Sequence, residues 1–308
     1  MKISIITPCF NEELNIERCI TETAEVMKSV EIDYEHIFCD NASTDKTVSI
    51  IKNFAAKNSK IKLIVNSRNV GPFRNMWIGL RNSTGDAVIP FLPADLQDPA
   101  SVIPEFVKIW LGGTLVVYGV RENRKESILM RASRGLYYRL ISRFSGSNLP
   151  PHVGEFLLAD RKVIDSILKV DDEYPYIRGL IAQTEVPSKF VYYSWAKRPH
   201  GKSKLNYLQL IDQALNGFVA TSRIPARLML LAGFIAAFLG LLGALITTFL
   251  VVLTNVVAAP GIPTIIVSIL FFGGIQMFFI GLIGEYVLSI HGQVRKNPPV
   301  FDTERINI

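Results

Sequence analysis

Short polar segments follow several predicted strands, and their side chains are suited to binding chemistry. Asp40 stands at the end of one predicted strand, and Asp95 and Gln97 come just after another. A carboxylate accepts hydrogen bonds from a polar ligand, and hard divalent cations prefer oxygen ligands that they share with phosphates. For Asp40 the alternative is a helix cap or a turn residue. The segments are Pro8-Cys9-Phe10-Asn11-Glu12, Asp40-Asn41-Ala42-Ser43-Thr44-Asp45, Asn69-Val70-Gly71 and Ala94-Asp95-Leu96-Gln97-Asp98-Pro99.

Basic residues form a second set of candidates, and phosphate is the ligand that matches them. Arg121 follows the fifth predicted strand, and Arg198 and Lys204 bound an Arg-Pro-His-Gly-Lys-Ser-Lys segment. Arg131 and Arg134 stand one helical turn apart in a basic stretch. The planar fork of arginine suits phosphate geometry, while lysine acts as a point charge. For each residue the alternative is a solvated helix face or a contact with lipid headgroups.

The elements that must position these residues alternate between strand and helix patterns in the first part of the chain. Short apolar runs separated by helical patterns predict an α/β fold with a mostly parallel sheet and helices on both faces. In such sheets ligands bind beyond the carboxyl ends of the strands. The expected strands are 3–7, 35–39, 61–65, 87–92, 115–119 and 189–195, and the expected helices begin near 13, 45, 72 and 100.

Taken in order, the strand-end segments resemble those of the family 2 glycosyltransferases, which have the Rossmann-like GT-A fold. Within that family the similarity is to the polyprenyl-phosphate glycosyltransferases, and Arg198–Lys204 and Ile283-Gly284-Glu285-Tyr286 add to it. The resemblance covers nearly the whole chain. It implies a hexosyltransferase that moves a sugar, with inversion, from a nucleoside diphosphate sugar to an undecaprenyl or dolichyl phosphate. A UDP-sugar is favoured as the donor by analogy with bacterial relatives.

The resemblance also implies a role for each candidate. The expected donor contacts are Pro8, Phe10, Glu12, Asp40, Ala94, Asp95, Arg121, Arg198 and Lys204. Arg131 and Arg134 would bind the phosphate of the lipid acceptor. Asp98 and Pro99 are expected only to start a helix, and Asp45 to cap one.

The expected metal site departs from the family pattern. In the family an Asp-x-Asp-x-Gln pattern holds Mg²⁺ or Mn²⁺ against the diphosphate, but here Pro93 takes the first position. A proline side chain cannot ligate a metal, so the remaining ligands would be Asp95, Gln97, donor phosphate oxygens and water. The change could weaken metal affinity, alter the donor or reduce activity. Asp95 is therefore expected both to bind metal and to serve catalysis.

Glu155 occupies the place where the family usually has an aspartate assigned as the catalytic carboxylate or acceptor organiser. The second pKa of a phosphate monoester is near 6, so the acceptor is already largely dianionic at neutral pH. Its oxygen can attack the anomeric carbon without losing a proton, and positioning and charge compensation should dominate. Glu155 could then orient a metal-bound water or an arginine. The alternative is a solvated surface glutamate.

A long uncharged stretch predicts a membrane anchor. No Asp, Glu, Lys or Arg occurs from Leu228 to Gly284, which is enough for two spans at about 228–253 and 264–288. Residues 205–227 precede them as an amphipathic juxtamembrane helix, suited to the membrane interface or, alternatively, packed on the domain. A buried hairpin in a soluble protein is the alternative for the spans. The domain organisation is then residues 1–204 as the transferase domain, the juxtamembrane helix, the hairpin at 228–288 and a cytoplasmic tail at 289–308.

The charges that flank the spans predict their orientation. Arg223 and Arg227 precede the first span, and Arg295 and Lys296 follow the second, so both flanks should be cytoplasmic. The amino-terminal sequence has no signal-peptide pattern, which would leave the catalytic domain in the cytoplasm as part of a multi-pass protein of the inner or plasma membrane.

The net charge of +6 fits an anionic membrane surface better than nucleic acid, and no nucleic-acid partner is expected. The three cysteines have no metal-type spacing and should be ordinary buried thiols. Relatives suggest a homo-oligomer, specifically a tetramer. Two other functions remain open: a catalytically weakened nucleotide-sugar-binding or regulatory homologue, and a processive polysaccharide synthase.

Overall fold

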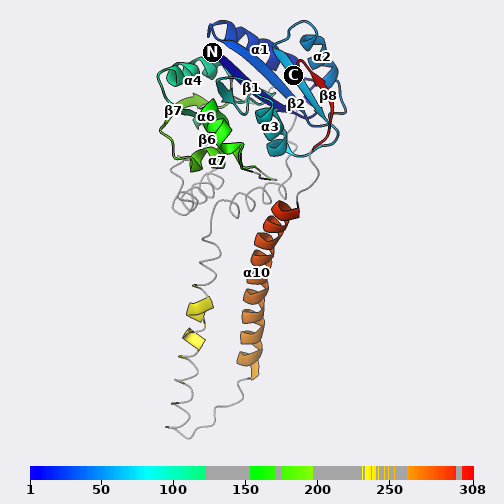
Figure 1. Ribbon diagram of the computed structural model, residues 1–308. Coiled ribbons are helices and arrows are strands. Elements are labelled where there is room, and N and C mark those ends of the chain that lie inside the picture. The colour runs from blue at the N-terminus through cyan, green and yellow to red at the C-terminus, as the bar shows by residue number, and fades with distance from the viewer. Residues whose placement is uncertain are drawn as a thin grey trace. The chain divides into compact units, whose positions relative to one another are not determined.

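The computed structural model describes residues 1–122, 153–170, 172, 175–196, 262–295 and 300–308, together with isolated positions between 231 and 253 (Figure 1). The chain divides into two compact units. The first comprises Met1–Leu205 with Lys296–Ile308, and the second comprises Asn206–Arg295.

The first unit is built on one mixed sheet. Its strands are β1 (Lys2–Cys9), β2 (Asp33–Asp40), β3 (Ile61–Asn66), β4 (Ala87–Ile89), β5 (Val116–Glu122), β6 (Val153–Asp160), β7 (Ser188–Ser194) and β8 (Asp302–Ile306). In the described part of the chain the order is β7-β5-β6-β4-β1-β2-β3-β8. Strands β1 to β4 pair in parallel, as do β5 and β7, whereas β6 and β8 pair antiparallel with their neighbours. The predicted mostly parallel α/β sheet is therefore confirmed.

Helices cover both faces of this sheet, as the sequence predicts (Figure 1). They are α1 (Ile16–Lys28), α2 (Thr47–Ala55), α3 (Pro72–Arg81), the 3₁₀ turn η1 (Ala100–Val102), α4 (Ile103–Leu111), α6 (Arg161–Ile167) and α7 (Ile177–Gln183). Side chains alternate between the two faces of a strand, so Ile5 belongs to the core that includes residues of α1, α2 and α4, and Ile6 belongs to the core that includes residues of α3, α6 and α7. Burial on both faces explains why apolar residues occupy adjacent positions in these strands.

The end of the chain returns to the sheet. β8 pairs antiparallel with β3, with Leu63 opposite Ile306, and closes one lateral edge with a short charged strand. Lys52 on α2 forms a salt bridge of 2.5 Å with Glu304 on that strand. The sequence predicts only a tail at 289–308, because Asp302–Ile306 has a single large apolar residue and too few positions to show a strand pattern.

The second unit contains the helix α10 (Ile262–Arg295), which includes the predicted span at 264–288. Within the described residues, Phe271–Gly292 is long and apolar enough to cross a membrane, with a mean hydropathy of 1.6. Large apolar side chains along it are exposed, for example Met277 at 70%. Most of the predicted span at 228–253 and the predicted amphipathic helix at 205–227 lie outside the described residues, although the described positions between 231 and 253 are helical. One candidate span is thus found, and the predicted two-helix hairpin is not shown.

Candidate active site

The sheet topology brings most of the predicted site residues to one end of the sheet. Strands β1 to β4 are parallel and end together; β6 runs antiparallel to β4 and to β5, so β5 ends at the same place and β6 begins there. We call this place the carboxyl end of the sheet. It collects the segments that follow β1, β2 and β4, together with Arg121 near the end of β5 and Glu155 near the start of β6.

Three loops at the carboxyl end contain a non-glycine residue with positive φ. These residues are Asn11 at 53°, Ala42 at 62° and Leu96 at 52°, in the loops after β1, β2 and β4. Such conformations cost on the order of 1–3 kcal/mol each and concentrate at functional sites, where the surroundings enforce them. Ala42 and Leu96 lack the local hydrogen bonding that makes this region tolerable for asparagine. Three further residues with positive φ, Glu31, Glu185 and Asn307, lie outside these loops, so the strain supports this end as the candidate site only together with the predicted site residues gathered there.

The loops after β1 and β2 are tied to each other by hydrogen bonds. The Asn11 amide N–H donates to Ser43 Oγ at 2.9 Å, and the Thr44 N–H donates back to Asn11 Oδ1 at 2.7 Å. The Glu12 N–H donates to Thr47 Oγ1 at 2.8 Å. The two halves of the predicted nucleotide pocket, from Pro8–Glu12 and Asp40–Asp45, therefore form one surface.

Asp40 lies buried at the end of β2, and its carboxylate holds the turn that follows. The Ser43 N–H donates to Asp40 Oδ2 at 2.8 Å, and the Cys9 thiol lies 3.8 Å from Oδ1. Burial raises the pKa of Asp40, and the hydrogen bond from Ser43 offsets part of that rise. The turn role that the sequence leaves open is thus present, and the donor contact stays a prediction. Cys9 and the other two cysteines are buried free thiols.

Asparagine side chains anchor the loop before α3. Asn41 Nδ2 donates to Asn69 Oδ1 at 2.8 Å, and the Val70 N–H donates to Asn41 Oδ1 at 2.9 Å. Asn75, one turn into α3, donates to the Cys39 carbonyl at 2.6 Å and is 1% exposed. The sequence analysis missed Asn75, although an amide on the apolar face of an amphipathic helix is a usable signal.

The predicted metal loop is a tight turn after β4. The Leu96 N–H donates to the Pro93 carbonyl at 2.9 Å, and the Gln97 N–H donates to Asp95 Oδ1 at 3.1 Å. The described residues contain no group of three or more His, Cys, Asp or Glu side chains able to hold a metal ion. One carboxylate and one amide, from Asp95 and Gln97, fit a cation that takes its other ligands from phosphate oxygens and water.

Asp98 does more than start a helix, which is all that the sequence predicts for it. It precedes η1, but its side chain is 1% exposed and forms a bidentate ion pair with Arg121, at 2.8 Å to Nε and 2.6 Å to Nη2. Tyr193, on β7, donates its hydroxyl to Asp98 Oδ1 at 2.6 Å. Burial alone would lower the pKa of Arg121, but the ion pair outweighs it and raises the pKa. Arg121 is therefore a fixed cation at the carboxyl end.

Glu155 is largely buried and paired, which removes the surface alternative. The Arg178 N–H donates to Glu155 Oε2 at 3.2 Å, and Arg178 Nε lies 3.7 Å from Oε1. Burial raises the pKa of Glu155, and Arg178 lowers it in part. Because side chains alternate along β6, Glu155 lies on the α7 face, whereas Gly154 lies beside Arg121 on the other. Arg178 gives no signal in the sequence, since it stands in a seven-residue helix without a motif.

Four predicted site residues, Arg131, Arg134, Arg198 and Lys204, lie outside the described residues. The segment that leads to the last two is described as far as Ala196, whose N–H donates to the Gln97 carbonyl at 3.0 Å. This hydrogen bond connects the chain beyond β7 to the metal loop.

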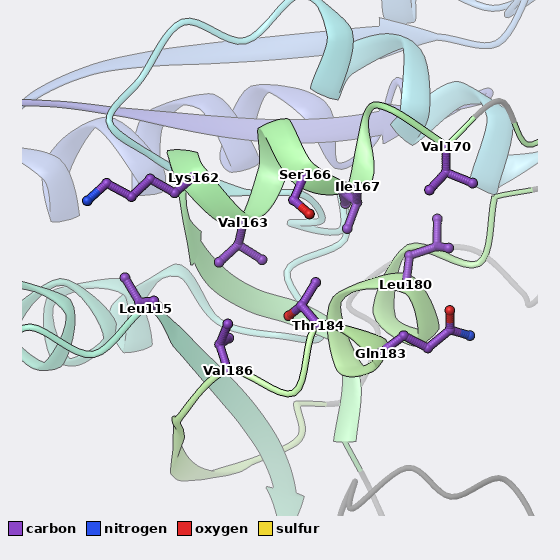
Figure 2. A pocket seen from close by; sticks show the side chains of 10 residues that line it. All are labelled: Leu115, Lys162, Val163, Ser166, Ile167, Val170, Leu180, Gln183, Thr184 and Val186. Carbon is purple, nitrogen blue, oxygen red and sulfur yellow. The ribbon is translucent and has the colours of Figure 1, made fainter.

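A cavity of about 420 Å³ lies at the other end of the sheet, between α6, α7 and the starts of β5 and β7 (Figure 2). Its lining residues are Leu115, Lys162, Val163, Ser166, Ile167, Val170, Leu180, Gln183, Thr184 and Val186. None of the predicted site residues lines it, and its wall is mostly aliphatic. The cavity is therefore separate from the candidate active site.

The fold is that of an α/β protein with a mostly parallel mixed sheet, and the loops of the candidate site lie at the carboxyl end of that sheet. The sequence model of glycosyl transferase family 2 matches residues 4–168, just over half of the chain. The chain belongs to this family and is a glycosyltransferase.

Relatives are similar along almost their full length. An uncharacterized glycosyltransferase of Synechocystis is 34% identical over 97% of this chain and 93% of its own. The bactoprenol glucosyl transferase of Shigella phage SfII is 33% identical over 97% of this chain and 96% of its own. Among solved structures, the glucosyl-3-phosphoglycerate synthase of Mycobacterium tuberculosis is 22% identical, with a TM-score of 0.49 over 70% of this chain and 78% of that one.

Proposed function

We propose that this glycosyltransferase moves a sugar from a nucleoside diphosphate sugar, with a UDP-sugar favoured, to a polyprenyl phosphate, and that it inverts the anomeric carbon. One observation carries the proposal: the loops after β1, β2 and β4 and the fixed cation Arg121 lie together at the carboxyl end of the sheet. The bactoprenol glucosyl transferase of phage SfII, similar end to end, supports the lipid acceptor.

On the donor side, the joined loops after β1 and β2 would hold the nucleoside, with Asp40 at their base. Asp95 and Gln97 would hold Mg²⁺ or Mn²⁺ at the diphosphate. Such an ion, when bound, neutralises the negative charge that builds on the leaving diphosphate. Arg121, held by its ion pair with Asp98, would bring guanidinium N–H donors near the same loop, and Arg198 and Lys204 remain predicted contacts to the same group.

On the acceptor side, an oxygen of the phosphate monoester forms the new bond to the anomeric carbon while the bond to the donor diphosphate breaks. The attacking oxygen carries no proton at neutral pH, so no general base is needed. Glu155 then has a positioning task, which its contact with Arg178 supports. Arg131 and Arg134 are proposed as contacts to the acceptor phosphate.

We also propose that the protein is integral to the membrane, with a two-helix hairpin at 228–288 and its catalytic unit in the cytoplasm. The candidate span Phe271–Gly292 and its exposed apolar side chains support the second half of that hairpin. The basic residues at its end favour a cytoplasmic carboxyl flank. A tetramer remains a proposal by analogy with relatives.

The second candidate function is a catalytically weakened homologue that binds nucleotide sugars. Pro93 favours it, because this residue removes one carboxylate from the metal loop. Against it, Asp95, Gln97 and Arg121 all remain in an ordered arrangement. If the protein had lost its catalytic activity, we would expect these residues to have been replaced together.

A transfer assay tests the proposal. Membranes that contain the protein would be incubated with undecaprenyl phosphate, Mn²⁺ and a panel of labelled UDP- and GDP-sugars. We expect label in the lipid fraction with at least one UDP-sugar, and a loss of at least about 100-fold for Asp95→Asn. Donor binding without any lipid-linked product would favour the weakened homologue.

A further inference from the structure

The buried carboxylate of Asp98 joins three parts of the candidate active site. It follows directly after the metal loop in sequence, binds Arg121 from β5 and accepts a hydrogen bond from Tyr193 on β7. The family resemblance assigns no role to Asp98. Its described contacts connect the metal loop to the ends of β5 and β7.

The ion pair fixes the direction of the Arg121 guanidinium. Both oxygens of Asp98 are used, one on Nε and the other on Nη2, so the group can neither rotate nor slide. Gly154 makes room for it, since a Cβ at that position would lie 3.1 Å from Arg121 Cζ. The guanidinium also lies over the Trp195 ring, with Cζ 5.7 Å from the ring centroid.

The hydrogen bond from Tyr193 also connects Asp98 to the end of β7. Tyr193 is 6% exposed and packs edge-on against Phe156, so its hydroxyl has a fixed position. Two residues later Trp195 lies by Arg121, and Ala196 donates its N–H to the Gln97 carbonyl. The described residues that follow β7, Trp195 and Ala196, are therefore held beside Arg121 and the metal loop.

We propose that Asp98 is a positioning residue for transfer: it aims Arg121 at the donor diphosphate and, through Tyr193, holds the end of β7 beside the same loop. The proposal rests on the proposed function. Without the carboxylate, Arg121 keeps its charge but loses its direction, and misplacement by about 1 Å costs about 100-fold in rate.

The test compares the full-length wild type with Asp98→Asn in vesicles that contain undecaprenyl phosphate and Mn²⁺. We expect kcat with the accepted UDP-sugar to fall about 100-fold, while KM for undecaprenyl phosphate changes little. Tyr193→Phe removes one hydroxyl and keeps the ion pair, so kcat should fall about fivefold. It serves as the second variant if Asp98→Asn does not fold.

Asp160→Asn is the matched control. Asp160 accepts a hydrogen bond from Trp110 Nε1 at 2.9 Å, but it lies at the opposite end of the sheet, beside the start of β4. This variant should lose stability and keep the wild-type kcat per folded molecule.

A double-mutant cycle with Arg121→Lys separates positioning from a merely structural role. If Asp98 acts through Arg121, the double variant should lose no more kcat than the worse single variant. Additive losses, or a wild-type kcat in Asp98→Asn or in Tyr193→Phe, would overturn the inference while active wild type still supports the proposed function. A wild type that makes no lipid-linked sugar would overturn both.

Discussion

Replacing Glu35 with glutamine should destabilise the first unit and leave transfer unchanged. Glu35 is 1% exposed, and it lies near the start of β2, away from the candidate active site. Its carboxylate accepts hydrogen bonds from Lys2 Nζ at 2.7 Å, Ser4 Oγ at 2.5 Å and the Thr84 N–H at 2.7 Å. Lys62 Nζ lies 2.8 Å from the same group. All of these contacts favour the ionised form.

The size of the effect follows from the pKa. Burial alone would raise the pKa of Glu35, but Lys2, Lys62, Ser4 and Thr84 together lower it from 4.5 to about 2. A shift of that size corresponds to about 3 kcal/mol of stability at neutral pH. Because the Lys2 side chain is 31% exposed, solvent screening reduces its share, and we expect a loss of about 2 kcal/mol.

The sign of the pH dependence is fixed by the lowered pKa. The stabilisation is complete above the unfolded-state pKa of about 4.5 and is lost as the pH falls toward 2. Urea unfolding of the wild type and Glu35→Gln in detergent should show a gap of about 2 kcal/mol at pH 7 that narrows below pH 4. Asp33→Asn, which breaks an exposed pair with Lys60, should cost less than about 1 kcal/mol. Equal stability of Glu35→Gln and wild type at pH 7, or a gap at pH 2.5 that is as large as the gap at pH 7, would refute this reasoning.

Three further substitutions probe the site. Pro93→Asp adds the missing carboxylate and should tighten Mn²⁺ at least about tenfold in a metal titration of the transfer rate, whereas an unchanged Mn²⁺ affinity would show that the loop binds metal by another arrangement. Gly154→Ala places a Cβ 3.1 Å from Cζ of the pinned Arg121 and should lower kcat about fivefold, whereas an unchanged kcat would show that the guanidinium is free to move. Glu155→Gln should lower kcat only about tenfold in steady-state kinetics, because it releases Arg178 without removing a base; a loss of about 10⁴-fold would mean that the carboxylate takes a proton.

The first five strands and the helices between them were predictable because both faces of the parallel sheet are buried. Ile5 and Ile6 belong to opposite cores, so adjacent positions of this strand are both apolar, which local composition reveals. The antiparallel strand β6, Val153–Asp160, was not among the predicted strands, and its direction depends on the path of the chain rather than on its own residues. β8 was missed because it is short, charged and stabilised by pairing with a strand far away in sequence.

The position of a candidate site residue was predictable where the residue directly follows a strand. A contact between two side chains was not predictable where they are far apart in the sequence. Asp40, Asp95 and Gln97 lie at the carboxyl end for that reason. The role of Asp98 depends on Tyr193, which is 95 residues away, and no local pattern links the two. Arg178 could not be identified from the sequence, because only the folded structure brings it, on α7, into contact with Glu155 on β6.

The most direct test of the account is the mass of the lipid product. Purified protein in vesicles with undecaprenyl phosphate, Mn²⁺ and a UDP-hexose should add one hexose to each acceptor molecule, and Asp95→Asn should add almost none. Acceptor that keeps its original mass with every donor tried, or that gains a ladder of sugars, would contradict transfer of a single sugar to a polyprenyl phosphate.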